Sequence, residues 1–352
     1  MDRISPLPDW VLLRILSFLP STKDAVSTMV LSKRWLPLWR MVPKLIYDDD
    51  SYKDIDYGRF LRFVDWSLLL HKAPILETLH FKLGQTCSVE DIPLWTSVAD
   101  NRSVREMIIK IRSSSSASPT IIPRSFYTGC RILVTLELND VILVDASSPI
   151  SFPSFKKLSL KSVKYPGDDF LKRLLSGCPV LEDLAVVQCA DDNVTTFTVR
   201  VPSLKRLLLE KSLEVKGDGF VIDTPSLESF DIADDSEAGF CLIESPMPNI
   251  VKADITVAFH PGNILSFVTS VKHLALCMAS AKGAAPWVRM RMLLVASSTV
   301  LDSPKLQALR LFKWKVTRMP GHEHPFALQL HMATIKSKPP NLVADKQGNI
   351  GK

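Results

Sequence analysis

The sequence has no long apolar run and no dense block of positive charge. Apolar stretches such as residues 132–134 and 292–296 are far shorter than the ~18–20 residues that a membrane-spanning helix needs. Residues 1–10 contain three charged residues and two prolines instead of the apolar core of a secretion signal. We therefore expect an intracellular protein of the nucleus or the cytoplasm, with no membrane partner. The net charge of +6 is scattered along the chain, so a nucleic-acid partner is not expected either.

Catalytic and metal-binding patterns are also missing. The 13 glycines form no phosphate-binding loop, and no nucleophile elbow is present. None of the six cysteines belongs to a C-x-x-C pair, so we expect buried free thiols and no zinc site. The adjacent carboxylates at residues 48–50 and the His-Glu-His sequence at residues 322–324 are expected in solvated loops. These absences predict a protein without metal, cofactor or catalytic activity of its own.

A recurring spacing of apolar residues is present along most of the chain. Each unit has an apolar residue, two others, a second apolar residue, one other and a third apolar residue. Successive first positions differ by 28, 29, 22, 26, 23, 23, 23 and 21 residues, and then by 35. This period is typical of leucine-rich repeats. The ten units are Leu76, Leu79, Phe81; Val104, Met107, Ile109; Leu133, Leu136, Leu138; Phe155, Leu158, Leu160; Leu181, Leu184, Val186; Leu204, Leu207, Leu209; Leu227, Phe230, Ile232; Ile250, Ala253, Ile255; Val271, Leu274, Leu276; and Leu306, Leu309, Leu311.

This spacing predicts a solenoid of stacked units. The last two apolar residues of each unit are two apart, as in a strand whose alternate side chains point to one side. One such strand cannot bury its apolar side alone, so stacked units are expected to share a continuous core. In the unit of residues 155–187, Asp168 is expected to cap a return helix, Gly177 to end it and Pro179 to prevent its continuation. Later units are shorter, so their return segments are expected to be irregular.

The first forty residues have helical spacing instead. Ser21 and Asp24 resemble a capping box at the start of a second helix, and Pro37 is expected to shorten a third helix around Trp35. Three short helices form only a small core, so part of their apolar surface is expected to bind another protein. The apolar residues at helical spacing in the first helix are Leu7, Val11, Leu12, Ile15, Leu16 and Leu19.

Several of these segments carry a family resemblance. Residues 7–9 (LPD), 15–20 (ILSFLP), 30–35 (VLSKRW) and 38–39 (LW) resemble the F-box of the plant F-box/leucine-rich-repeat proteins of the FBD type. Residues 174–184 (LLSGCPVLEDL) and 201–207 (VPSLKRL) resemble the repeats of the same family. The resemblance implies an α/β repeat protein. A three-helix F-box precedes a leucine-rich-repeat solenoid, whose curved parallel sheet has helices and loops on its convex side.

The resemblance also implies a division of the chain and a function. The expected parts are an F-box at residues 1–45, a linker at 46–74, the solenoid at 75–318 and an irregular tail at 319–352. An F-box of this kind binds the Skp-type adaptor of an SCF-type cullin–RING ubiquitin ligase, and the repeats bind a target protein for ubiquitination. The positions expected to contact the adaptor, or to hold the contacting helices, are Leu7, Pro8, Ile15, Leu16, Leu19, Val26, Leu31 and Trp35.

The sequence departs from the family pattern at three places. Trp10 stands where the family usually has an acidic residue, and Leu36 where an arginine is common. Beyond Met319 the FBD region of the family looks truncated or replaced. The alternatives are therefore a leucine-rich-repeat scaffold that no longer binds the adaptor, and a sensor with a small ligand on the concave face.

The concave face of the solenoid is the expected target-binding surface. Alternate residues of each strand, such as residues 157, 159 and 161, are expected to point to it. The charged residues there suggest an acidic target segment against the middle units, although solvated surface charges are the more common explanation. The residues of this hypothesis are Lys157, Lys161, Arg206, Asp231 and Asp254.

Overall fold

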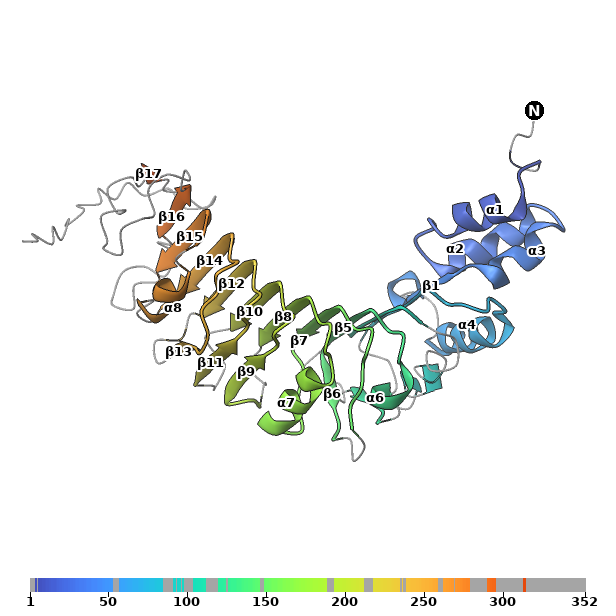
Figure 1. Cartoon of the computed structure of the whole chain (residues 1–352). Coiled ribbons are helices and arrows are strands. Elements are labelled where there is room, and N and C mark those ends of the chain that lie inside the picture. Colours follow the sequence, from blue (N-terminus) through green and yellow to red (C-terminus); the bar gives the residue numbers. More distant parts are fainter. Residues whose placement is uncertain are drawn as a thin grey trace, which may run out of the picture. The chain divides into compact units, whose positions relative to one another are not determined.

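A computed structural model of the chain provides the fold (Figure 1). It describes residues 4, 6–52, 57–84, 91–92, 94–95, 97, 104–111, 120–124, 126–145, 149–188, 193–211, 218–234, 236, 239–258, 262–268, 270–278, 290–295 and 313–314. The expected tail at residues 319–352 and the tenth repeat unit at residues 306–311 lie outside the described residues.

The N-terminal part consists of short helices around a small core. Leu12, Leu16, Trp35, Leu38 and Val42 are buried against one another. The capping prediction is confirmed, because the Ser21 hydroxyl accepts a hydrogen bond from the Asp24 backbone N–H at 3.1 Å. The helices are α1 (Asp9–Leu16), α2 (Thr22–Ser27), η1 (Thr28–Val30), α3 (Trp35–Leu38) and η2 (Trp39–Met41).

The rest of the described chain is built on one twelve-stranded sheet. Its strands follow one another in chain order and pair in parallel from β1 to β15, whereas β16 and β17 join antiparallel. The strands are β1 (Lys44–Asp48), β2 (Thr78–Leu83), β3 (Glu106–Ile111), β5 (Thr135–Asn139), β7 (Lys157–Lys161), β8 (Asp183–Gln188), β10 (Arg206–Lys211), β12 (Ser229–Asp234), β14 (Lys252–Val257), β15 (His273–Met278), β16 (Met290–Val295) and β17 (Lys313–Trp314).

The repeat spacing predicted these strands correctly. Each of the nine units within the described residues contains one strand of the sheet, from β2 to β15. Buried and half-buried residues alternate along these strands; for example, Leu79 and Phe81 are fully buried between half-buried neighbours. The sheet is therefore the expected solenoid, with one residue in two of each strand in a continuous core.

The return segments form a second layer on one side of the sheet (Figure 1). The prediction of irregular returns in the later units is wrong, because β9, β11 and β13 pair in a second parallel sheet. Aromatic and β-branched residues such as Phe197 and Val199 favour strands there and are buried. The return elements are β4 (Thr120–Ile122), α6 (Phe126–Gly129), β6 (Val141–Leu143), α7 (Asp168–Ser176), β9 (Thr196–Arg200), β11 (Gly219–Asp223), β13 (Phe240–Ile243) and α8 (Gly262–Phe267).

The predicted return helix α7 is present, but its start differs in detail. Gly177 ends the helix as expected, whereas the N-cap residue is Gly167 and Asp168 is the first helical residue. The Asp168 carboxylate instead accepts a hydrogen bond from the Thr195 hydroxyl at 2.7 Å. Asp168 therefore fastens the helix to the segment before β9.

The expected linker at residues 46–74 contributes to the sheet and its end. Strand β1 pairs in parallel with β2, and helices η3 (Asp49–Tyr52) and α4 (Tyr57–Leu70) follow it. The Thr22 hydroxyl of α2 accepts a hydrogen bond from the Ile46 backbone N–H of β1 at 2.8 Å. This bond satisfies a donor on the edge strand of the sheet.

We predict that Thr22→Val lowers the free energy of unfolding by about 1–3 kcal/mol, because the isosteric side chain leaves the Ile46 N–H without its acceptor. Urea unfolding followed by circular dichroism measures the change. Thr22→Ser keeps the hydroxyl, so its free energy of unfolding is expected to fall much less. Equal losses in the two variants would contradict a role for this hydrogen bond.

The cysteines within the described residues agree with the expectation of free thiols. Cys130, Cys178 and Cys241 are free and buried. Burial raises the pKa of the Cys178 thiol to about 12, and it also raises the pKa of Cys241 to about 12. These two thiols therefore stay protonated at neutral pH. Among the described helices, none has the length and apolar character to cross a bilayer.

Candidate functional site

Seven of the eight residues predicted to contact an adaptor fall into two groups in the structure, and Val26 is intermediate. Leu16 and Trp35 are buried in the helical core, and Leu7 and Leu19 are packed against it. These four residues hold the helices together. Val26 is half-buried on α2.

The other predicted residues offer apolar surface to a partner. Pro8 is exposed, Ile15 is 41% exposed and Leu31 is 63% exposed. Exposed apolar residues on so small a helical unit are typical of a protein-binding surface. The same helices expose further apolar residues that were not among the predicted adaptor contacts. They are Trp10, Phe18, Val30 and Leu36.

Trp10 and Phe18 could have been found from their spacing. Trp10, Arg14 and Phe18 are four residues apart along α1 and its C-terminal turn, away from Leu12 and Leu16. The Arg14 guanidinium lies over the Phe18 ring, 5.1 Å from its centroid. Trp10 and Phe18 are each 72% exposed. Two aromatic side chains this exposed are suitable anchors for a partner.

Arg34 holds the start of α1 in place. Its guanidinium donates to the Asp9 carboxylate at 2.6 Å and to the Leu7 carbonyl oxygen at 2.5 Å. Asp9 is in the first turn of α1, where a negative charge is favourable. These two hydrogen bonds of Arg34 fix the backbone of Leu7 and Pro8 relative to the start of α3.

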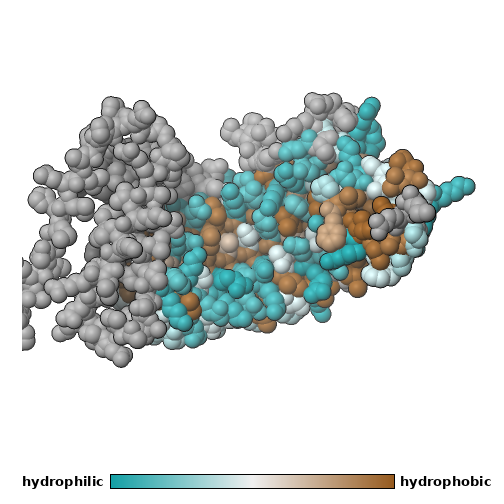
Figure 2. Space-filling model, turned by 90° about the horizontal axis from the view of Figure 1, so that it is seen from above, coloured by the Kyte–Doolittle hydropathy of each residue, from teal (hydrophilic) through white to brown (hydrophobic). Residues whose placement is uncertain are grey.

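The second candidate surface is the side of the twelve-stranded sheet that the return layer does not cover. We call it the open face; it consists of the half-buried and exposed residues that alternate with core residues in β2 to β15. Figure 2 shows this face from above, with apolar residues along its middle and hydrophilic residues on both sides. The face was expected to be the concave, target-binding side.

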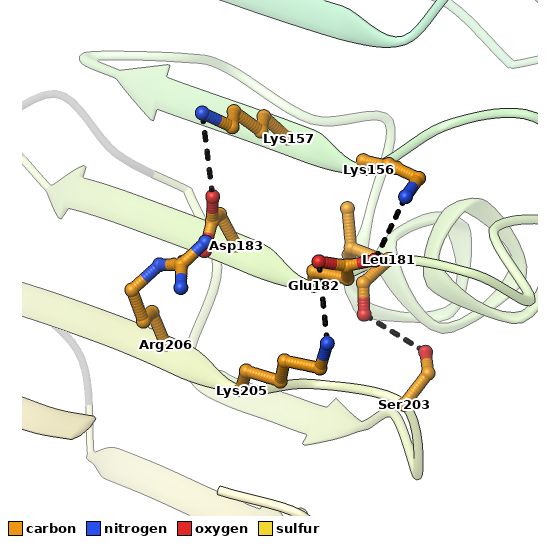
Figure 3. Close-up of polar contacts among 8 residues, drawn as sticks. All are labelled: Lys156, Lys157, Leu181, Glu182, Asp183, Ser203, Lys205 and Arg206. Carbon is orange, nitrogen blue, oxygen red and sulfur yellow. Dashed lines mark hydrogen bonds and ion pairs between the residues drawn. The ribbon is translucent and has the colours of Figure 1, made fainter. Parts of the chain in front are cut away.

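Two rows of alternating charge lie at the start of β7, β8 and β10, the first just before the strands and the second on the open face (Figure 3). In the first row, Glu182 lies 3.0 Å from the Lys156 ammonium and 3.5 Å from the Lys205 ammonium. In the second row, Asp183 lies 3.8 Å from the Lys157 ammonium and also pairs with the Arg206 guanidinium. Each carboxylate therefore bridges two cations. We call the six residues the charge ladder.

The strand register places these charges side by side. Lys157, Asp183 and Arg206 are partners on neighbouring parallel strands. The hydrogen bond from Lys156 lowers the pKa of Glu182, with a further contribution from Lys205. The hydrogen bond to Asp183 raises the pKa of Arg206. Both shifts favour the charged forms of Glu182 and Arg206.

A groove of about 400 Å³ runs along the open face from β5 to β12, and Lys157, Asp183 and Arg206 form part of its lining. Ser159, Ala185 and Leu208 line its floor, and they are register partners on β7, β8 and β10. Small side chains at the first two positions leave room for a side chain of a bound molecule. The groove is within the size range of ligand sites but lies open on the sheet.

The residues predicted to bind an acidic target are not one basic cluster. Lys157 and Arg206 share Asp183, and Lys161 is exposed at the other end of β7. Asp231 and Asp254 are half-buried register partners on β12 and β14. The carboxylate of Asp183 separates Lys157 from Arg206, which was not predicted from the sequence. A target role for the five residues remains a prediction.

The carboxylates of residues 48–50 lie within 4.8 Å of one another, and these residues are half-buried or buried. The Lys82 ammonium lies 2.8 Å from Asp48 and 3.6 Å from Asp50. The Gly84 backbone N–H donates to Asp49. An ammonium and a backbone amide therefore account for the cluster. The expectation that the protein binds no metal stays a prediction.

Comparison with known proteins identifies similar chains. Residues 92–245 match the family model of the leucine-rich repeats of FBD-associated F-box protein At5g56370. The putative FBD-associated F-box protein At5g50270 of Arabidopsis thaliana is 59% identical over 282 residues, which cover 79% of this chain and 68% of the relative. The probable FBD-associated F-box protein At1g32375 is 51% identical, over 90% of this chain and 79% of its own. The F-box/FBD/LRR-repeat protein At5g56420 is 41% identical over 95% of this chain and 84% of the relative. Both are also from Arabidopsis thaliana.

Proposed function

Because the chain belongs to the plant family of FBD-associated F-box proteins with leucine-rich repeats, we propose that it is the substrate-recognition subunit of an SCF-type cullin–RING ubiquitin ligase. Proteins of this family are typically non-catalytic subunits. The F-box, residues 1–45, binds a Skp-type adaptor and through it a cullin. The solenoid, residues 75–318, binds the target protein in the nucleus or the cytoplasm.

The observation that carries this proposal is the apolar surface of the N-terminal helices. Their core uses Leu12, Leu16 and Trp35, while Ile15 and Leu31 remain exposed on the same small unit. A surface of this kind gains free energy when a partner covers it. The open face is separate from this surface, so one chain can hold an adaptor and a target together. Holding both on one scaffold raises their effective concentration, and the chemistry belongs to the other subunits.

A second candidate function is a scaffold that binds targets without the adaptor. The observation in its favour is that Trp10 and Leu36 are both exposed, where the family usually has an acidic residue and an arginine. Trp10 and Leu36 would then replace charges that the adaptor recognises. The solenoid is the same in both candidates.

The test compares the full chain with the variant Trp10→Glu/Leu36→Arg, each co-expressed with a plant Skp-type adaptor. We expect the wild type to capture the adaptor and to support ubiquitin transfer in a reaction reconstituted with cullin and RING subunits. Circular dichroism controls for folding. Capture by the variant alone would favour the scaffold, with Trp10 and Leu36 as the cause. Capture by neither folded chain would contradict the ligase proposal.

A further inference from the structure

The charge ladder presents cations, rather than its carboxylates, to a partner. The side chains of Lys157 and Arg206 are 59% and 52% exposed, whereas the Asp183 side chain between them is 20% exposed. The same holds in the other row, where Lys156 and Lys205 are more exposed than Glu182. The ladder has four cations and two carboxylates, and Glu228 adds a third carboxylate near Arg206, so a net charge of +1 remains. A partner that approaches the open face here meets positive charge.

The carboxylates also hold the cations in position before any partner arrives. Asp183 pairs with Lys157 on one side and Arg206 on the other. Long side chains usually lose conformational freedom when they bind, and a side chain that is already held loses less. The cations of the ladder are thus partly ordered by folding, before a partner binds.

The floor of the groove, formed by small or apolar side chains, begins at the next outward-facing position of the same strands. Ser159, Ala185 and Leu208 follow Lys157, Asp183 and Arg206 by two residues, which is about 6.6 Å along a strand. Figure 3 shows Lys157, Asp183 and Arg206 on three neighbouring strands. Two neighbouring side chains on the same side of an extended peptide have a similar separation. One of them can enter the groove while the other meets the cations.

Two carboxylates that line the groove, Asp231 and Glu137, limit where an anionic side chain of a partner can bind. Asp231 lines the groove on β12, beyond Leu208. At the opposite end Glu137 lies 2.8 Å from the Lys110 ammonium. Since Asp231 repels an anion in the row of Leu208, the position for negative charge is the row of Lys157 and Arg206.

We propose that the target carries an extended segment with an aliphatic side chain that enters the groove and an anionic side chain, two residues away, that pairs with Lys157 and Arg206. The anion is a carboxylate or a phosphorylated hydroxyl group. The inference rests on the proposed function, in which the open face binds the target. It gives that target a chemical class.

The experiment measures retention of fluorescent ten-residue peptides on the immobilised full chain. Three peptide pools share a central leucine and random other positions, and differ two residues from the leucine: aspartate, phosphoserine or asparagine. We expect the aspartate or the phosphoserine pool to be retained at least about 10-fold more than the asparagine pool, as for a charge-assisted hydrogen bond. The stronger of the two identifies the source of the negative charge. Equal retention of all three pools would overturn the proposal.

Variants then locate the binding surface. Lys157→Gln/Arg206→Gln is expected to abolish the preference for anionic pools, and Ala185→Trp to reduce retention by filling the groove. Asp183→Asn removes a negative charge that competes for the two cations. This electrostatic gain is expected to outweigh the lost ordering of Lys157 and Arg206 and to increase retention of the anionic pools several-fold. The control Lys172→Gln/Arg173→Gln removes two equally ion-paired cations from α7 in the return layer. An unchanged preference in Lys157→Gln/Arg206→Gln would contradict the proposal, whatever the adaptor assay gives.

Adaptor capture and peptide retention can fail independently of each other, because peptide retention needs no adaptor. A chain that captures the adaptor but shows no pool preference keeps its ligase role and loses this target chemistry. A chain that prefers anionic pools but captures no adaptor would be the scaffold with the same target class.

Discussion

The double variant Ile15→Asp/Leu31→Asp is expected to lose capture of a Skp-type adaptor by at least about 100-fold while the chain stays folded. Both side chains are exposed on the N-terminal helices, so aspartate is solvated there in the free protein. In a complex each aspartate would be buried against apolar atoms, and central interface residues typically contribute about 2 kcal/mol or more. Two such losses exceed a 100-fold change in affinity. Surface plasmon resonance with purified adaptor measures this change in affinity.

Two controls make the result specific. Leu242→Asp/Val251→Asp introduces the same charge at exposed apolar positions of the solenoid and is expected to leave adaptor binding unchanged. Leu16→Ala removes a buried side chain of the helical core and is expected to weaken binding through the stability of the helices. Full capture by Ile15→Asp/Leu31→Asp would place the adaptor elsewhere on the chain.

A second large effect is expected from Asp234→Leu at the end of β12. Asp234 and its register partner Lys211 on β10 are both buried. Ser236 links them, because it donates to the Asp234 carboxylate at 2.5 Å and lies 3.4 Å from the Lys211 ammonium. Removing the carboxylate leaves a buried ammonium without the negative charge of its neighbour. We expect a loss of about 3–5 kcal/mol in the free energy of unfolding, measured by urea denaturation.

The double variant Lys211→Met/Asp234→Leu tests the cause of that loss. Replacing both residues by apolar groups removes the buried ammonium together with the carboxylate, so most of the stability is expected to return. Equal destabilisation in the single and double variants would show that Asp234 acts through shape or through Ser236 alone.

The repeat strands could be predicted because the core imposes their spacing. A parallel strand whose alternate residues are buried needs apolar residues two apart, and the sequence shows them in every described unit. Strand β1 was missed although Val42, Leu45 and Tyr47 repeat the spacing and are buried. They stand 34 residues before the next unit, outside the period of the repeats. The antiparallel strand β16 was also missed. It lies in the 35-residue interval between the ninth and the tenth unit, where the repeat spacing gives no signal.

The two candidate surfaces were only partly predictable. Helical spacing identifies apolar residues of a short helix but does not separate Leu16, in the core, from Ile15, on the surface. The charge ladder depends on which residues become neighbours across strands. The repeat steps vary from 21 to 29 residues, so Asp183 meets Lys157 and Arg206 only once the register is fixed.

The alternation along the strands separates two kinds of mutational constraint. Residues such as Leu184 and Val186 fill the core, where a change of one methylene group alters stability. Their neighbours Asp183 and Ala185 point away from it, and substitutions at such positions usually change stability little. The chemistry of the open face can therefore diverge between gene duplicates while the solenoid remains intact. A protein of this architecture can acquire a new target by point mutations at alternate positions, without first acquiring a new fold.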